Sequence, residues 1–202
     1  MSGSLRPSLW RRNARWRSLS CSTTPEGSPK ACAFADRLRS AGHHVALPDV
    51  FDGATFGTVE EGVAHAEEIG FDEIVSRGEA AVADLPAQLV YGGFSLGAMP
   101  AQKLAQNRPG AKALLLYEGG VPLSTYGGAW PDGVALQIHA KEVDAWSEVD
   151  VLQELARAVP GAELYLYPGG DHLFTDASLD AYDEQATDMV AERTLIMLRR
   201  LG

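Results

Sequence analysis

Cysteine is scarce in this sequence, since only Cys21 and Cys32 occur among its 202 residues. Two cysteines are too few for a disulfide framework, and their spacing matches no metal-binding motif. Long apolar runs are also missing, because no uninterrupted stretch approaches the about 18 residues that a transmembrane helix needs. We therefore expect a cytoplasmic protein with no disulfide scaffold, no metal and no membrane partner.

Basic residues are fewer than acidic ones, 17 against 27, which gives a formal net charge of −10. Binding to nucleic acid or to an anionic membrane would call for a basic face, so neither is an expected partner. With 202 residues and 46% hydrophobic composition, the chain is long enough for one domain with a sizeable core.

The N-terminal segment departs from the rest because it has no acidic residue before Glu26, whereas basic residues gather there. It shows neither the period of a strand nor that of a helix, and it lacks the apolar core of a secretory signal. We interpret residues 1–25 as an atypical basic segment, either disordered or a poor strand, and residues 26–202 as a single domain. An organelle transit peptide, an incorrect start or reading frame in the source sequence, and a basic tail each fit this composition.

From residue 31 onward, helical and extended patterns alternate. Amphipathic spacing predicts helices near 31–41, 58–69, 71–84, 97–107, 149–159 and 182–200. Short apolar runs predict strands at 44–48, 88–92, 113–117, 134–139 and 163–168. Continuously apolar strands separated by helices are typical of a mainly parallel sheet covered on both faces, so the expected fold is an α/β doubly wound domain.

The stretch Gly93-Phe94-Ser95-Leu96-Gly97 lies between a predicted strand and a predicted helix. It matches the G-x-S-x-G nucleophile elbow, in which a sharp turn exposes the serine hydroxyl above the sheet. Glycines suit both flanks because strand and helix approach closely there. The strand ends of such a fold are also where chemistry is expected. We therefore predict that Ser95 is a nucleophile.

A serine hydroxyl needs a base to take its proton and an acid to orient that base. In this fold the acid and then the histidine follow the serine along the chain. Three of the five histidines precede Ser95 or lie in a helix pattern and are expected to be structural or solvated: His43, His44 and His65. His139 ends a strand with no strand-end acid before it and is expected to play a supporting part. His172, after the last strand, satisfies the required order.

The loop after the strand 134–139 offers the acid. Glu142 and Asp144 both lie there, and Asp150 follows. We favour Asp144, with Glu142 as its main competitor. The oxyanion of acyl transfer needs two backbone N–H donors. One is expected from Leu96, directly after the nucleophile, and the other from the loop 23–30.

Residues 33–62, 91–106, 117–146 and 163–186 resemble the dienelactone hydrolase family of α/β-hydrolases, and the resemblance covers about residue 26 to the C-terminus. It implies a triad of Ser95, Asp144 and His172, which favours Asp144 over Glu142. It also implies a compact hydrolase without a large lid and without a cofactor. The expected substrate is a small ester or lactone.

The sequence departs from that family in three places. Founding members carry cysteine where this chain has Ser95, which favours ordinary carboxylic-ester chemistry. They also bind a substrate carboxylate through arginines, one of them soon after the histidine, whereas Leu173, Phe174, Thr175 and Asp176 follow His172 here. A dienelactone substrate is therefore not expected.

The third departure is the N-terminus, where family members have an apolar strand in the interior of the sheet. Either residues 15–23 fill that position as a poor strand, or the sheet opens, or this N-terminus is not the native one. Unpaired backbone groups in a buried sheet would cost about 1–3 kcal/mol each. We expect the second oxyanion donor to be misplaced. The alternatives to an esterase are then an impaired hydrolase-fold protein and a thioesterase or acyltransferase with the same triad. Tyr117 and Trp130 are candidate walls of the pocket entrance, unless both belong to the core.

Overall fold

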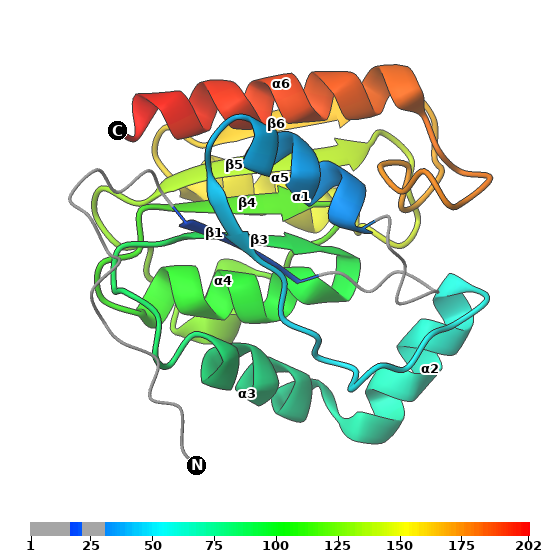
Figure 1. Cartoon of the computed structure of the whole chain (residues 1–202), viewed down its shortest axis with the longest axis horizontal. Helices are drawn as coiled ribbons and strands as arrows, with labels where there is room; N and C mark the ends of the chain where they lie inside the picture. Colours follow the sequence, from blue (N-terminus) through cyan, green and yellow to red (C-terminus); the bar gives the residue numbers. More distant parts are fainter. Residues whose placement is uncertain (1–16, 22–30) are drawn as a thin grey trace, which may run out of the picture.

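The computed structural model describes residues 17–21 and 31–202 and is built around a six-stranded sheet. The strand order is β2-β1-β3-β4-β5-β6, and all five neighbouring pairs are parallel (Figure 1). The strands are β1 (Arg17–Cys21), β2 (His44–Ala46), β3 (Val90–Phe94), β4 (Ala113–Tyr117), β5 (Ala135–Lys141) and β6 (Glu163–Tyr167). The fold is thus a parallel α/β fold of the predicted class.

In the described ranges, five α-helices and two short 3₁₀ helices lie between strands, and a sixth α-helix follows β6. The α-helices are α1 (Ala31–Ser40), α2 (Val59–Ile69), α3 (Phe71–Ala81), α4 (Ala98–Asn107), α5 (Val149–Ala158) and α6 (Glu184–Arg200). The 3₁₀ helices are η1 (Ser95–Gly97) and η2 (Leu123–Tyr126). Two of the N-termini are capped by side chains, because Thr58 accepts from the Glu61 N–H and Asp183 accepts from the Ala186 N–H.

Each face of the sheet packs against its own set of helices (Figure 1). Helices α1 and α6 cover one face with apolar side chains such as Phe34, Leu38 and Val190. On the other face, α4 and α5 contribute Leu104 and Leu152 to a second core. Because both faces are covered, the central strands are apolar throughout, and every residue of β3 and β4 is buried.

Strand β1 occupies the interior position, between β2 and β3, for which the sequence offers no apolar strand. It pairs with β2 through Arg17, Ser18 and Leu19, and with β3 from Ser18 to Cys21. The alternative in which the sheet opens at this point is wrong, because β1 supplies backbone partners to both neighbours. Residues 17–21 therefore take the form of a strand despite a composition that does not favour one.

An aromatic ladder crosses four adjacent strands at the same register. Phe94, Tyr117, His139 and Tyr165 are consecutive cross-strand partners from β3 to β6. Their rings stack in turn, with centroids 4.3, 5.5 and 5.3 Å apart. Offset aromatic pairs of this kind contribute about 0.5–1.5 kcal/mol each beyond the burial of area. The ladder fixes the strand ends just before the loops that carry the candidate site.

The predicted elements are confirmed, with shifts at their ends. Strand β3 reaches Phe94, two residues beyond the predicted end, so the strand leads directly into Ser95. Strand β2 stops at Ala46 and α3 stops at Ala81, both earlier than predicted. Across the described ranges, the helices are all too short or too polar to span a bilayer.

Candidate active site

Ser95 lies at the turn between β3 and α4, in a conformation that L-residues rarely adopt. Its φ angle is 50°, and it opens the 3₁₀ turn η1 that leads into α4. A Cβ atom at Gly93 would collide with the backbone of Gly97 and lie 2.6 Å from the Ala98 nitrogen. Glycine at position 93 is therefore required for the close approach of strand and helix. This is the geometry predicted for a nucleophile elbow.

Ser95, His172 and Asp144 form one hydrogen-bonded chain. His172 Nε2 lies 2.8 Å from Ser95 Oγ, and His172 Nδ1 lies 2.7 Å from Asp144 Oδ2. The three residues come from the loops after β3, β6 and β5, which meet at the carboxyl edge of the sheet. The imidazole and the carboxylate are buried, with 4% and 0% of their side chains exposed.

Asp144 is held by two further donors. The Trp146 N–H donates to Oδ1 at 2.9 Å, and the Ser147 hydroxyl donates to Oδ2. Burial by itself would raise the pKa of Asp144, but the hydrogen bonds from His172 and Ser147 outweigh it and hold the pKa below its usual value. Asp144 is therefore a carboxylate at neutral pH and favours the imidazole tautomer that carries its proton on Nδ1.

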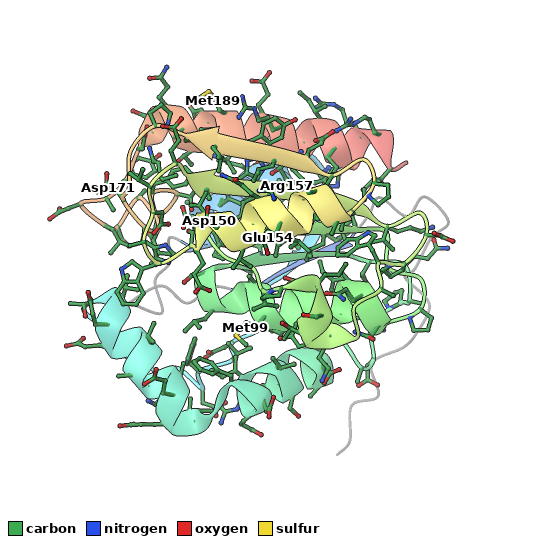
Figure 2. The ribbon with its side chains drawn as sticks, turned by 180° about the vertical axis from the view of Figure 1, so that it is seen from behind. Met99, Asp150, Glu154, Arg157, Asp171 and Met189 are labelled. Atoms are coloured by element: carbon green, nitrogen blue, oxygen red, sulfur yellow. The ribbon has the colours of Figure 1, made fainter. Side chains whose placement is uncertain are left out.

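The competing acids lie elsewhere. Glu142 is exposed in the same loop, and Asp150 is exposed on the first turn of α5 (Figure 2). His139 lies in the aromatic ladder, where its ring nitrogens contact Tyr167 Oη at 2.8 Å and Gln137 Oε1 at 2.9 Å. Burial lowers the pKa of His139 to about 3, so it stays neutral. The acid that contacts His172 is thus Asp144, and neither Glu142 nor Asp150 does so. His139 is a buried residue that packs within the sheet.

A cavity of about 220 Å³ opens beside Ser95. Its apolar walls include Val63 from α2 and Met99, which points from α4 toward α2 and α3 in Figure 2. Trp146 and Glu148 border it from the loop before α5, and among the described lining residues none is basic. The cavity is thus small and largely apolar, with acidic groups at its edge.

The hypothesis that Tyr117 and Trp130 form walls of the pocket entrance is wrong. Tyr117 is 2% exposed and packs edge-on against Phe34 within the core under α1 and α6. The Trp130 indole donates to the Val134 carbonyl at 2.8 Å and packs against the other core. Both side chains stabilise the sheet and its loops.

The loop after β4 is fixed close to the nucleophile. A Cβ atom at Gly119 would lie 2.6 Å from the Ser95 carbonyl oxygen, so only glycine fits there. On α4, Gln102 exchanges two hydrogen bonds with the backbone of Val121, at 2.9 and 3.0 Å. Gln106 donates to the Leu123 carbonyl at 3.1 Å. Sequence patterns did not indicate these contacts, because a buried glutamine on a helix resembles a solvated one.

Glu118, a fully buried acid beside the candidate triad, was not among the site residues predicted from the sequence. It lies next to Gly119 at the end of β4 and borders the cavity. Burial is the main cause that raises its pKa to about 8, and the nearby Asp144 carboxylate raises it further. The only sequence signal was an acid directly after an apolar strand, at the edge where loops converge on a ligand.

Strained backbone is concentrated around this site. Five non-glycine residues in the described ranges have positive φ angles, and four of them are Ser95, Glu118, Glu148 and Leu173. The first three line the cavity, and the fourth follows His172. Such conformations cost about 1–3 kcal/mol each and collect at functional sites. Their grouping here supports the location of the site.

Leu96, the predicted first oxyanion donor, also lines the cavity and lies in the first turn after Ser95. The opening N–H groups of a helix have no intrahelical acceptor and suit a developing negative charge. The predicted second donor, in the loop 23–30, lies outside the described residues. Within residues 33–202 no cluster of histidine, cysteine and acidic side chains has the arrangement of a metal site.

A parallel sheet with a strained serine turn and a buried histidine and acid from later strand ends defines an α/β hydrolase. The family model described as "Dienelactone hydrolase family" matches residues 29–202. The chain therefore belongs to the dienelactone hydrolase family, as the resemblance in its sequence indicated.

Several solved structures have a similar fold. A dienelactone hydrolase-like promiscuous phosphotriesterase from metagenomic libraries has a TM-score of 0.73 and 14% identity, covering 95% of this chain and 88% of its own. A putative dienelactone hydrolase from Klebsiella pneumoniae has a TM-score of 0.68 and 15% identity, with 94% and 89% covered. A thermophilic esterase from Thermogutta terrifontis has a TM-score of 0.61 and 18% identity, with 98% and 88% covered. No curated protein matches the chain in sequence.

Proposed function

We propose that this protein is a serine hydrolase that cleaves a small, uncharged carboxylic ester or lactone through an acyl-enzyme. The observation that carries the proposal is the continuous hydrogen-bonded chain from Ser95 Oγ through the His172 imidazole to Asp144 Oδ2. A base within hydrogen-bond reach of the nucleophile, itself oriented by a carboxylate, is the arrangement that activates serine.

In the first half of the reaction, Ser95 Oγ attacks the carbonyl carbon while its proton passes to His172 Nε2. The carbonyl oxygen becomes an oxyanion and accepts a hydrogen bond from the Leu96 N–H. The tetrahedral intermediate then collapses. The bond to the leaving oxygen breaks, the alcohol takes the proton from His172, and the acyl group stays on Ser95.

In the second half, a water molecule attacks the acyl-enzyme and gives its proton to His172 Nε2. Collapse of this second intermediate releases the carboxylic acid and returns the proton to Ser95 Oγ. A lactone yields one hydroxy acid in place of separate alcohol and acid. Asp144 remains ionised throughout and stabilises the imidazolium that forms in both halves.

The shape and charge of the cavity support an uncharged substrate. A volume of about 220 Å³ accommodates a short acyl group, since sites for drug-sized ligands occupy about 300–1,000 Å³. Glu118 and Glu148 border the cavity, and the described lining residues include no arginine or lysine to bind a carboxylate. An anionic acyl chain would meet the Glu148 carboxylate, and no basic side chain among the described lining residues would pair with it.

Matched p-nitrophenyl esters test this proposal. We expect kcat/KM for the butyrate to exceed that for the hemisuccinate, an acyl chain of equal carbon number with a terminal carboxylate, at least about tenfold. Glu148→Gln removes a negative charge beside the cavity and should therefore reduce the difference in kcat/KM between the two esters. Ser95→Ala should lower kcat about 10⁴-fold or more for either ester. A loss of kcat below tenfold in Ser95→Ala would refute the assignment of Ser95 as the nucleophile. A preference for the hemisuccinate would refute the proposed uncharged substrate.

A related solved structure, a thioesterase domain from the curacin biosynthetic pathway, has a TM-score of 0.61 and 16% identity. The same triad could transfer or hydrolyse thioesters. Matched oxygen and sulfur esters with the same acyl group separate these activities. A carboxylic ester hydrolase should turn over the oxygen ester at a rate comparable with that of the thioester.

A further inference from the structure

Glu118 is a buried acid that the proposed reaction does not use. Glu118 is 0% exposed and has a positive φ angle of 58° directly after β4. Its N–H donates to the His139 carbonyl at 2.7 Å, which fixes the backbone there. A buried carboxyl group in a strained position, next to a nucleophile, requires a physical reason for its presence.

One oxygen of Glu118 links the end of β4 to the loop that carries the base. This loop, residues 168–183 between β6 and α6, is called here the His172 loop. Glu118 Oε1 accepts from the Thr175 N–H at 3.3 Å and lies 3.4 Å from the Thr175 hydroxyl. Since Thr175 is three residues from His172, these contacts restrain the position of the imidazole relative to Ser95.

The other oxygen, Glu118 Oε2, is buried and has no hydrogen-bond partner among the described residues. Among the described residues, the charged groups around Glu118 are acidic, except for His172, and the neighbouring Tyr117 and His139 are neutral. Asp144 comes from the loop after β5, Glu148 borders the same cavity before α5, and Asp176 is buried beside Thr175 in the His172 loop. No described lysine or arginine hydrogen bonds to Glu118. An ionised Glu118 would therefore be a buried anion without a counter-ion.

We infer that Glu118 is a positioning residue whose neutral carboxyl group anchors the His172 loop through Thr175, without placing a negative charge beside the oxyanion that forms at Ser95. The inference rests on the proposed function, because it assigns Glu118 a part in that reaction. A protonated glutamate can anchor the loop because its carbonyl oxygen accepts from Thr175. It also adds no charge beside the oxyanion, because the protonated carboxyl group is neutral. Loss of the proton leaves the anchor but adds a negative charge next to the cavity, which opposes formation of the oxyanion.

The first test is the pH dependence of kcat/KM with p-nitrophenyl butyrate. The wild type should lose activity on the alkaline side as Glu118 ionises, near its pKa of about 8. Glu118→Gln keeps an acceptor for Thr175 and cannot ionise, so it should retain activity at pH 7 within about threefold and lose this alkaline decline. Glu118→Ala removes the acceptor and should lower kcat at least tenfold across the whole pH range.

Asp176→Asn is the matched control, because Asp176 is a second buried acid of the same region with an unpartnered oxygen. This variant should keep the alkaline decline. If kcat/KM of Glu118→Gln still declined at alkaline pH, ionisation of Glu118 would not be its cause. Loss of the alkaline decline in Asp176→Asn would overturn the same assignment. Wild-type kcat in a folded Glu118→Ala would overturn the anchoring role.

A measurement without turnover separates this inference from the proposed function. Because the folded pKa of Glu118 lies above that of the unfolded chain, ionisation of the unfolded state lowers the stability of the wild type as pH rises from about 4.5 to about 8. The Tm of Glu118→Gln should therefore exceed that of the wild type by an amount that grows over this range. A constant Tm difference would refute a buried neutral Glu118 whether or not any ester is hydrolysed. Absence of ester hydrolysis together with a growing Tm difference would instead refute only the proposed function and the catalytic role built on it.

Discussion

The change of Asp144 to asparagine tests how the site activates its serine. Asp144 Oδ1 accepts from the Trp146 N–H at 2.9 Å, so the amide oxygen of an asparagine would keep that position. The amide NH₂ would then replace Oδ2, which now accepts from His172 Nδ1 at 2.7 Å. Because NH₂ can only donate, His172 would have to accept on Nδ1 and carry its proton on Nε2.

In that tautomer, Nε2 points a proton at Ser95 Oγ and can no longer remove one. We expect kcat for p-nitrophenyl butyrate to fall about 10⁴-fold, equivalent to about 5 kcal/mol of lost transition-state stabilisation. The side chain keeps its size and its contact with Trp146, so the fold should persist. Circular dichroism and thermal unfolding would verify this before kinetics are measured.

Two matched variants isolate the tautomer effect. Glu142→Gln changes an exposed carboxylate of the same loop and should leave kcat unchanged within about twofold. Ser147→Ala removes a second donor to Asp144 Oδ2 but leaves the carboxylate, so kcat should fall by less than about tenfold. An Asp144→Asn variant that keeps more than a tenth of wild-type kcat, or a Glu142→Gln variant that loses most of it, would refute this reasoning.

Three further predictions concern stability. Gly93→Ala should destabilise the domain by about 1–3 kcal/mol or more, because its methyl group would collide with the Gly97 backbone. Gly62→Ala within α2 should instead stabilise the domain by about 0.5–1 kcal/mol. Denaturant unfolding should show a lower free energy of unfolding for the first variant and a higher one for the second. Asp183→Asn should destabilise the protein at pH 7 because Lys141, 4% exposed, loses its carboxylate partner at 2.5 Å. The α6 cap and this ion pair hold the pKa of Asp183 below its usual value. The difference in Tm should therefore disappear as pH falls through the lowered pKa of the folded state, and a difference independent of pH would contradict this prediction. Ser20→Val in β1 should raise Tm, because an interior strand of a covered parallel sheet favours β-branched apolar residues; an unchanged or lower Tm would contradict the interior placement of β1.

The succession of elements could be predicted from the sequence because it depends on local patterns. Apolar runs such as 113–117 are short, continuous and bounded by helices, which leaves few alternatives to a buried parallel strand. Ser95, Asp144 and His172 were identified from chain order, strand ends and family resemblance. The structure brings these three side chains together and leaves Glu142 and Asp150 exposed.

The parts of the site and of the sheet that were not predicted depend on tertiary contacts that no local pattern encodes. Glu118 resembles any acid after a strand until its burial and its contact with Thr175, 57 residues away, are known. Gln102 and Gln106 resemble surface residues of α4, yet they hold the loop that borders the cavity. Strand β1 has poor strand composition and is a strand because neighbours on both sides offer backbone partners.

Labelling with a fluorophosphonate tests directly whether Ser95 is an activated nucleophile, since this probe reacts preferentially with a serine whose base is in place. After incubation with the full-length protein, tandem mass spectrometry of the digest would locate the adduct. We expect one adduct, on Ser95, that is absent after His172→Ala although the variant remains folded. Folded wild-type protein without an adduct at Ser95, or equal labelling of Ser95 in His172→Ala, would contradict it.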